Sequence, residues 1–367
     1  MNIKLTSRRT LLATSLAVVL GSFSVASVAE SLPALKINEA KAALGKRLFF
    51  DKRLSGDAAI SCATCHQPEH GFAHPDALSP GYPGNKHFRN SPTVINSAHK
   101  KVWFHDGRLG TNLNDVTREM LTEDYLMNMD MRIMQERVKQ DPVYVKMFKD
   151  AGYGEPSNGS VRKAIPEYLK TLTSKNAPYD TGKMSTAAKR GQKIFNGKGG
   201  CSSCHSGANF TDNKPHNTGV AENFDVFLDP MRHQAFIAYA MFMGVENYMN
   251  LKRDPGAYVQ WKKADFSNMG TFITPSLREL KQTAPYMHNG MISTLDEVVE
   301  FYNQGGGQDS HKDAALKPLK LSAKEKKDLV AFLESLSGDQ LTGPEHVWTE
   351  KYPDEYPVIA DWNNVKN

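Results

Sequence analysis

The chain has 367 residues, which is enough for two domains with substantial cores. It carries 45 basic and 40 acidic residues, and the resulting formal charge of +5 is too mixed to indicate nucleic-acid binding. The first residues must be judged separately, because they differ in composition from the rest.

Residues 1–29 are typical of a cleaved export signal. Lys4, Arg8 and Arg9 form a positive start, an apolar stretch runs to Val28, and a small-residue cleavage site ends at Ala29. Serine and threonine residues interrupt the apolar stretch, which argues against a retained membrane anchor. Cleavage removes three basic residues and no acidic one, so the charge falls from +5 to +2. We therefore expect a mature, soluble protein in the periplasm.

Two Cys-x-x-Cys-His strings use all four cysteines of the chain. This spacing is the attachment signature of c-type haem: two thiols one helical turn apart form thioethers, and the next histidine ligates the iron. Two disulfides or a zinc site are the alternatives, but neither explains why a histidine follows each pair. The predicted cofactors are two covalently bound haems, held by Cys62, Cys65, His66, Cys201, Cys204 and His205.

A weak internal repeat precedes the two motifs. Residues 45–49 (GKRLF) and 191–195 (GQKIF) each end a helix-like run, which Asn38 opens in one case and Ser185 or Thr186 in the other. The repeat predicts a mainly α fold of two cytochrome-c-like helical domains, each around one covalently bound haem. We place these domains at residues 30–180 and 181–342, with a junction near 177–183, and expect the 343–367 tail to pack over the body.

Further helices are indicated around residues 129–152 and 160–173. Capping boxes at 294–297 and 322–325 each begin another helix. Leu329, Phe332, Leu333 and Leu336 fall on one face of the last helix, and glycines at 305–307 stop the preceding one.

Several strings beyond the haem motifs make the chain resemble the bacterial di-haem cytochrome c peroxidase and MauG family. They are RNSPTV at 89–94, DGR at 106–108, HNTGV at 216–220, TAPYMHNG at 283–290 and TLDE at 294–297. The resemblance implies that hydrogen peroxide reacts at the N-terminal haem and that the C-terminal haem relays electrons. It also implies a calcium ion between the domains, bound by the side-chain oxygen of Asn90 and the main-chain carbonyls of Thr283 and Pro285. Oxygen ligands suit Ca²⁺, although Asn90 could instead cap a loop without an ion.

Tyr302 indicates the subtype within the family. Classical peroxidases have a methionine ligand to the second haem at this position, whereas MauG is similar to this chain in having tyrosine. A neutral thioether favours ferrous iron and an anionic phenolate favours ferric iron. Tyr302 as a ligand predicts a protein that reacts with both haems ferric. The alternative is a core tyrosine on a helix face.

The region between the haems departs from the family pattern. Many members have tryptophan directly before the DGR string, but here His105 takes that place and Trp103 lies two residues earlier. Either residue remains a candidate for the bridge between the haems. Arg108 is expected to bind a haem propionate, and His288 matches a family position near the second haem, where it could equally anchor a loop.

The acid–base group expected on the peroxide side also differs. The family supplies a glutamate helped by a glutamine, and cleavage of the peroxide bond needs such a group to move a proton. The expected glutamate position falls near Tyr125 or Leu126. Glu123 and Glu119 are the nearest carboxylates, with Glu123 slightly preferred, although each could be an ordinary surface residue.

These features lead first to an enzyme that uses hydrogen peroxide at the N-terminal haem to oxidise an aromatic residue of a protein substrate by long-range electron transfer. One alternative is a cytochrome c peroxidase that reduces hydrogen peroxide to water with electrons from a small cytochrome c or cupredoxin. Another is a non-enzymatic di-haem electron carrier. The partners expected are therefore peroxide and a periplasmic protein, and a homodimer is possible.

Overall fold

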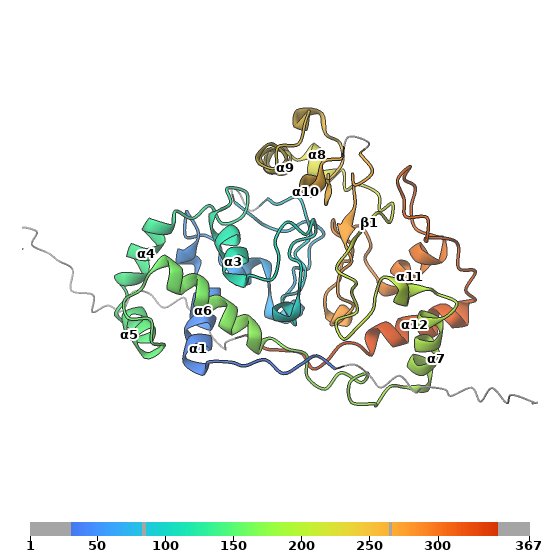
Figure 1. The fold of residues 1–367 in the computed structure, drawn as a ribbon, viewed down its shortest axis with the longest axis horizontal. Helices are drawn as coiled ribbons and strands as arrows, with labels where there is room; N and C mark the ends of the chain where they lie inside the picture. The colour runs from blue at the N-terminus through green and yellow to red at the C-terminus, as the bar shows by residue number, and fades with distance from the viewer. Residues whose placement is uncertain (1–30, 83–85, 264–265, 344–367) are drawn as a thin grey trace, which may run out of the picture.

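The computed structural model describes residues 31–82, 86–263 and 266–343. The predicted export signal and residues 344–367 of the predicted tail lie outside these ranges. The described chain is mainly helical and has two helical bodies side by side, with a smaller helical unit over their junction (Figure 1). None of its helices combines the length and the apolar character that crossing a membrane requires.

Helices α1 and α3–α6 belong to one body, and α7, α11 and α12 to the other (Figure 1). The bounds are α1 Glu39–Phe50, α2 Cys62–Cys65, α3 Leu113–Thr122, α4 Met131–Lys139, α5 Pro142–Asp150, α6 Asn158–Thr171, α7 Thr186–Asn196, α8 Asp225–Leu228, α9 Pro230–Phe242, α10 Tyr258–Trp261, α11 Leu295–Asn303 and α12 Ala323–Glu334. Strands β1 (Pro215–His216) and β2 (Phe272–Ile273) pair antiparallel, with Pro215 opposite Ile273. Short 3-10 turns cover Lys52–Leu54, Pro68–His70, Ser97–His99, Cys201–Ser203, Tyr248–Asn250 and Leu280–Gln282.

Capping residues set the helix ends much as the sequence predicts. Asn38 accepts a hydrogen bond from the Lys41 N–H, Ser185 caps α7, and both predicted capping boxes are present at α11 and α12. The segment 129–152, predicted to be helical, forms two helices: α4 ends at Lys139, and Asp141 caps a new helix that begins at Pro142. Proline has no N–H and fits the first turn of a helix better than its interior.

The two bodies use the same helix crossing. In the first, α1 packs on α6, and a Cβ on Gly45 would collide with the Ala164 carbonyl. In the second, α7 packs on α12, and a Cβ on Gly191 would collide with the Asp328 carbonyl. The glycines that open the two repeated strings are therefore the points where each pair of helices makes its closest approach.

The repeat extends well beyond these helices. Segments 103–109 and 286–292 each close with a bridge, Trp103 to Leu109 and Tyr286 to Ile292. In both segments the second residue, Phe104 or Met287, has a left-handed backbone. A left-handed glycine, Gly107 or Gly290, follows three residues later. Helix α3 or α11 then follows, so His105 and His288 occupy equivalent positions in the two halves.

Helices α8–α10 have no counterpart among the described residues of the first half. They build a separate apolar cluster that also includes Leu78, Phe88 and Tyr125 from the first half. The other members come from the inserted region, namely Val226, Ala235, Phe236, Tyr239, Ala240, Val245, Tyr258, Val259 and Met269. The remaining core consists of one cluster over residues 44–172 and one over 195–336. The inserted helices of the second half thus pack against the first body through a shared apolar cluster.

Candidate functional site

The first Cys-x-x-Cys-His motif opens onto an internal cavity of about 210 Å³. Helix α2 and the residue after it place Cys62, Cys65 and His66 on the cavity wall. Part of the opposite half also lines it, through residues 209–213 and 273–276. The predicted first haem site therefore lies where the two halves meet.

His66 is oriented for iron ligation by a backbone carbonyl. Its Nδ1 lies 3.2 Å from the Phe72 carbonyl oxygen, so this nitrogen donates, and Nε2 would be the nitrogen that ligates a metal. Phe72 adopts a left-handed backbone, with φ of 55°. Burial lowers the pKa of His66 to about 4, which keeps the imidazole neutral.

The second motif repeats this arrangement. Cys201 begins a 3-10 turn, and the Nδ1 of His205 lies 3.0 Å from the Phe210 carbonyl oxygen. Phe210 is also left-handed, with φ of 51°, and burial lowers the pKa of His205. Both histidines thus present a neutral imidazole that a backbone carbonyl orients through Nδ1, as suits a haem ligand.

All four cysteines are free thiols, so the disulfide alternative finds no support. Burial raises the pKa of Cys62 and Cys65 to about 12 and that of Cys201 to about 11. These thiols and the two histidines fit two c-type haems, which would supply the redox chemistry.

A zinc site is not supported either. Cys204 lies near Asp212 and His216, but both ring nitrogens of His216 already face carboxylates, Asp313 at 2.6 Å and Asp212 at 2.9 Å. Burial lowers the pKa of His216, but the two carboxylates outweigh this effect and raise it overall. His216 is therefore a charged partner of two aspartates and offers no free nitrogen to a metal.

Tyr302 lies on α11 beside the second motif. Burial raises the pKa of its hydroxyl to about 12, and the nearby thiols of Cys201 and Cys204 add to this effect. The hydroxyl is thus close to the two atoms that would hold the second haem.

The two bridge candidates both line the first cavity. The His105 ring donates from Nε2 to the Asn90 carbonyl oxygen at 3.1 Å, and its own carbonyl accepts from Ile273 on β2 at 2.8 Å. Trp103 is buried beneath the ammonium group of Lys100, which lies 5.2 Å from the ring. A cation over an indole disfavours its oxidation, so the geometry favours His105 as the residue linking the two halves.

Lys100 itself was missed by the sequence reasoning. It lines the cavity, and burial lowers its pKa to about 8. Among the described residues no carboxylate forms an ion pair with it, so it suits a haem propionate. Arg108, which was predicted for that role, also lines the cavity but is already bound to Asp106 and Glu119.

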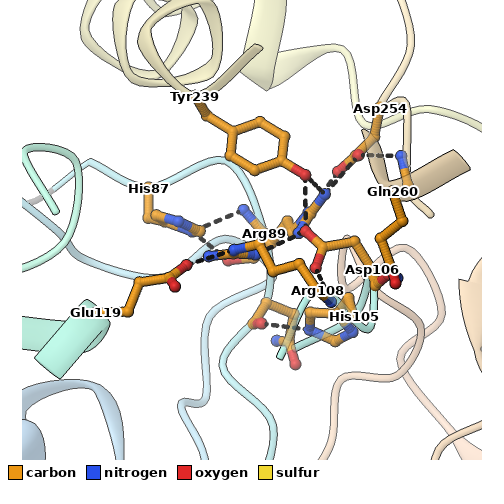
Figure 2. Close-up of polar contacts among 11 residues, drawn as sticks. His87, Arg89, His105, Asp106, Arg108, Glu119, Tyr239, Asp254 and Gln260 are labelled. Atoms are coloured by element: carbon orange, nitrogen blue, oxygen red, sulfur yellow. Dashed lines mark hydrogen bonds and ion pairs between the residues drawn. The ribbon is translucent and has the colours of Figure 1, made fainter. Parts of the chain in front are cut away.

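Figure 2 shows a buried ion network, and three of its members, Arg89, Arg108 and Tyr239, also line the cavity. Asp106 accepts from Arg89 at 2.7 Å, from Arg108 at 2.6 Å and from the Tyr239 hydroxyl at 2.7 Å. Arg89 also binds Asp254 through two hydrogen bonds of 2.6 and 2.7 Å. The network ties two motif strings of the first half to the inserted helices of the second half.

Neither predicted acid–base carboxylate lines the cavity. Glu119 is buried and paired with Arg108, and Glu123 caps the end of α3. No aspartate or glutamate occurs among the described residues of the cavity wall. The α3 residues on the wall are Val116, Thr117, Met120 and Leu121.

Asn90, one of the predicted calcium ligands, contacts the segment that follows the other two along the chain. The Asn90 N–H donates to the His288 carbonyl at 2.9 Å, which places Asn90 beside the turn of residues 286–292 that follows Thr283 and Pro285 in the chain. Asn90 Nδ2 donates to the Asp76 carbonyl at 3.1 Å, which leaves the side-chain oxygen Oδ1 available. His288 stacks on Phe272, with ring centres 3.6 Å apart.

Comparison with known proteins identifies similar chains over nearly the whole length. A family model described as di-haem cytochrome c peroxidase matches residues 39–188. Cytochrome-c peroxidase IdrP2 of Denitromonas iodatirespirans is 48% identical, over 93% of this chain and 94% of that protein. Methylamine utilization protein MauG of Methylorubrum extorquens is 34% identical, over 84% and 82%. The crystal structure of a MauG-like protein associated with microbial copper homeostasis superposes with a TM-score of 0.72 at 24% identity, over 89% of this chain and all of that one, and so shares the fold.

Proposed function

Because this chain belongs to the family of di-haem cytochrome c peroxidases, we propose that it reduces hydrogen peroxide in the cavity beside His66. The electrons come from a small periplasmic redox protein and enter through the site beside His205. The observation that carries this proposal is the 48% identity with a cytochrome-c peroxidase over 93% of the chain. The comparisons thus favour the peroxidase alternative over protein oxidation, which the sequence ranked first.

The geometry supports a division of labour between the two sites. His66 lines a cavity in which peroxide could bind, whereas at the second site Tyr302 lies beside the cysteines of the motif and could ligate the iron. His105 connects the two sites. Its ring lines the cavity, and its carbonyl accepts a hydrogen bond from β2, which is followed by Pro275, a backbone partner of His205. When bound, the haems supply electron transfer and peroxide activation. The protein holds each proximal imidazole neutral and oriented.

The test compares two matched variants of the haem-loaded protein. Cys62→Ser with Cys65→Ser removes attachment of the first haem, and Cys201→Ser with Cys204→Ser removes that of the second. Peroxide consumption is measured with a reduced small cytochrome c as donor. We expect the first variant to stop reacting with peroxide and the second to lose only donor-linked turnover. Turnover that survives in the first variant would contradict the proposal.

A second candidate function, oxidation of an aromatic residue in a partner protein, rests on Tyr302 and on the MauG relative. Phenolate ligation predicts that the diferric protein reacts with peroxide before any reduction. Tyr302→Met should restore a need for prior reduction of one haem, and Tyr302→Phe separates ligation from packing. If the diferric wild type is inert to peroxide, this candidate is excluded.

We also propose that Ca²⁺ is bound by Asn90, Thr283 and Pro285 and that it holds the two halves together. Asn90 Oδ1 and the main-chain carbonyls of the adjoining turn are the hard ligands that calcium prefers. Chelation should lower the thermal midpoint of the wild type, and added calcium should restore it. In Asn90→Ala both effects should disappear. Equal midpoints with and without chelator in the wild type would contradict the site.

A further inference from the structure

The distal wall of the first haem site lacks the carboxylate that the peroxide reaction would normally use. All the described cavity-lining side chains are neutral or basic. Glu119 is occupied by Arg108, and Glu123 lies off the wall. Another polar group must therefore contact a ligand bound there.

Most hydroxyl groups on the wall are already committed. Ser79 and Ser91 bond to each other at 2.6 Å, and the Thr117 hydroxyl bonds to the Leu113 carbonyl at 2.8 Å. The Tyr239 hydroxyl donates to Asp106 at 2.7 Å. His87 is fixed as well, because its Nδ1 accepts from the Arg89 N–H at 3.0 Å.

Tyr125 is the exception among these hydroxyl groups, and the indole N–H of Trp103 is a second donor on the wall without a partner among the described residues. Its ring lines the cavity, only 3% of the residue is exposed, and its hydroxyl has no hydrogen-bond partner among the described residues. A buried hydroxyl without a partner costs free energy, and such a group commonly marks a position where a ligand or water belongs. The Phe88, Tyr239 and His87 rings pack around it, with centres 5.7 to 6.1 Å away.

We propose that the Tyr125 hydroxyl is a catalytic residue that donates a hydrogen bond to the oxygen ligand at the first haem, in place of a distal carboxylate. This deepens the proposed function and rests on it. A phenol cannot act as the strong proton acceptor that a carboxylate provides. Instead it stabilises negative charge on the bound ligand. The positive charge of Arg108 acts on the hydroxyl and would reinforce this effect, against the opposing charges of Glu123 and Glu119.

The test uses ligands other than peroxide, so it is independent of turnover. Fluoride binding to the ferric protein is titrated optically, and the stretching frequency of carbon monoxide on the ferrous protein is measured by infrared spectroscopy. Tyr125→Phe should weaken fluoride by about tenfold or more, the usual effect of losing a hydrogen bond to a charged acceptor. It should also raise the carbon monoxide frequency.

Two variants serve as controls. Tyr144→Phe removes another buried hydroxyl, which donates a hydrogen bond of 2.7 Å to Asp51. Tyr144 does not line the cavity, so this variant should change neither signal. Glu123→Gln tests the rival carboxylate and should also leave both signals unchanged. A second measurement needs no variant: transfer of the fluoride complex to heavy water should shift the iron–fluoride vibration in the wild type.

The outcomes separate the two proposals. Wild type that binds fluoride and carbon monoxide, with unchanged signals in Tyr125→Phe, overturns the role of Tyr125 and leaves the peroxidase proposal standing. A shift in Glu123→Gln alone assigns the role to Glu123. Wild type that binds neither ligand overturns the proposed function, and the role of Tyr125 with it.

Discussion

Asp106 shows how much of the site depends on one buried charge. It is completely buried and accepts from two arginines and a tyrosine, and these partners hold its pKa well below the usual range despite the opposing effect of burial. Without the Asp106 carboxylate, the buried guanidinium groups of Arg89 and Arg108 would each lose one of their anionic partners.

Asp106→Asn should therefore lower the free energy of unfolding by about 3–5 kcal/mol, the usual cost of breaking a buried ion pair. Urea unfolding of the haem-loaded protein measures this. Asp130→Asn is the control, because Asp130 pairs with the exposed Arg132 and should leave the midpoint unchanged. Similar midpoints for both variants would mean that the network contributes little to stability.

The raised pKa of Glu222 predicts that the free energy of unfolding depends on pH. Burial, with a contribution from Asp254, raises its pKa from 4.5 to about 7. An acid with a raised folded pKa stabilises fully below its unfolded pKa and loses that contribution as the pH rises through the folded value. Between pH 4.5 and pH 7 the wild type should lose about 3 kcal/mol relative to Glu222→Gln. Parallel urea midpoints across this window would contradict the assignment.

Single residues differ in how far the sequence predicts them. The cysteines and proximal histidines follow from the local spacing, because their chemistry requires adjacent positions in the chain. The carbonyls of Phe72 and Phe210 that orient those histidines depend on backbone conformation, which has no residue signature here. Tyr125 was noted only as the place of a missing glutamate, since a hydroxyl without a partner can be recognised only once the neighbours are known.

At the level of helices, the two crossings at Gly45 and Gly191 are the most restrictive contacts. Each glycine meets a backbone carbonyl of the facing helix, which cannot move aside as a flexible side chain can. These crossings also position the helices that precede the two haem motifs.

Gly45→Ala and Gly191→Ala should each destabilise the protein by about 1–3 kcal/mol or more, as expected for overpacking of a tight core. Gly159→Ala is a matched control on α6, since nothing lies within 4 Å of its Cβ position, and it should be neutral or slightly stabilising. Thermal unfolding measures all three. Stability gained by all three substitutions would show that the crossings tolerate a methyl group.

Element boundaries were predictable where side chains signal them. The capping residues of α1, α7, α11 and α12 are local signals and were found, whereas the break at Asp141–Pro142 was overlooked despite its own signal. The unit built by α8–α10 was not predicted, because its apolar residues are distributed around the helices and acquire a direction only through contact with the first half.

For the molecule as a whole, the shared cluster around Phe236 predicts cooperative unfolding. Phe236 is fully buried and packs edge-on against Phe88 of the first half, with ring centres 5.6 Å apart. Wild-type unfolding followed by far-ultraviolet circular dichroism and by haem absorbance should coincide.

Phe236→Ala should cost about 3–5 kcal/mol and separate the two transitions, because the halves lose their common packing. Phe148→Ala provides the comparison, since Phe148 is equally buried but lies within the first-half core alone. Phe148→Ala should lower the free energy of unfolding by a similar amount, but its two transitions should still coincide. Coincident transitions in both variants would mean that the inserted helices do not couple the halves.

The structural repeat has a consequence for how the two haem sites can be studied. The N-caps Asn112 and Thr294 begin equivalent helices, and Met120 and Tyr302 stand at the same distance beyond them. Trp103 likewise corresponds to Tyr286, and His105 to His288. Each half is therefore an internal reference for the other, in one scaffold and one solvent. The chemical contrast between the two sites reduces to a short set of paired side chains that can be exchanged one pair at a time.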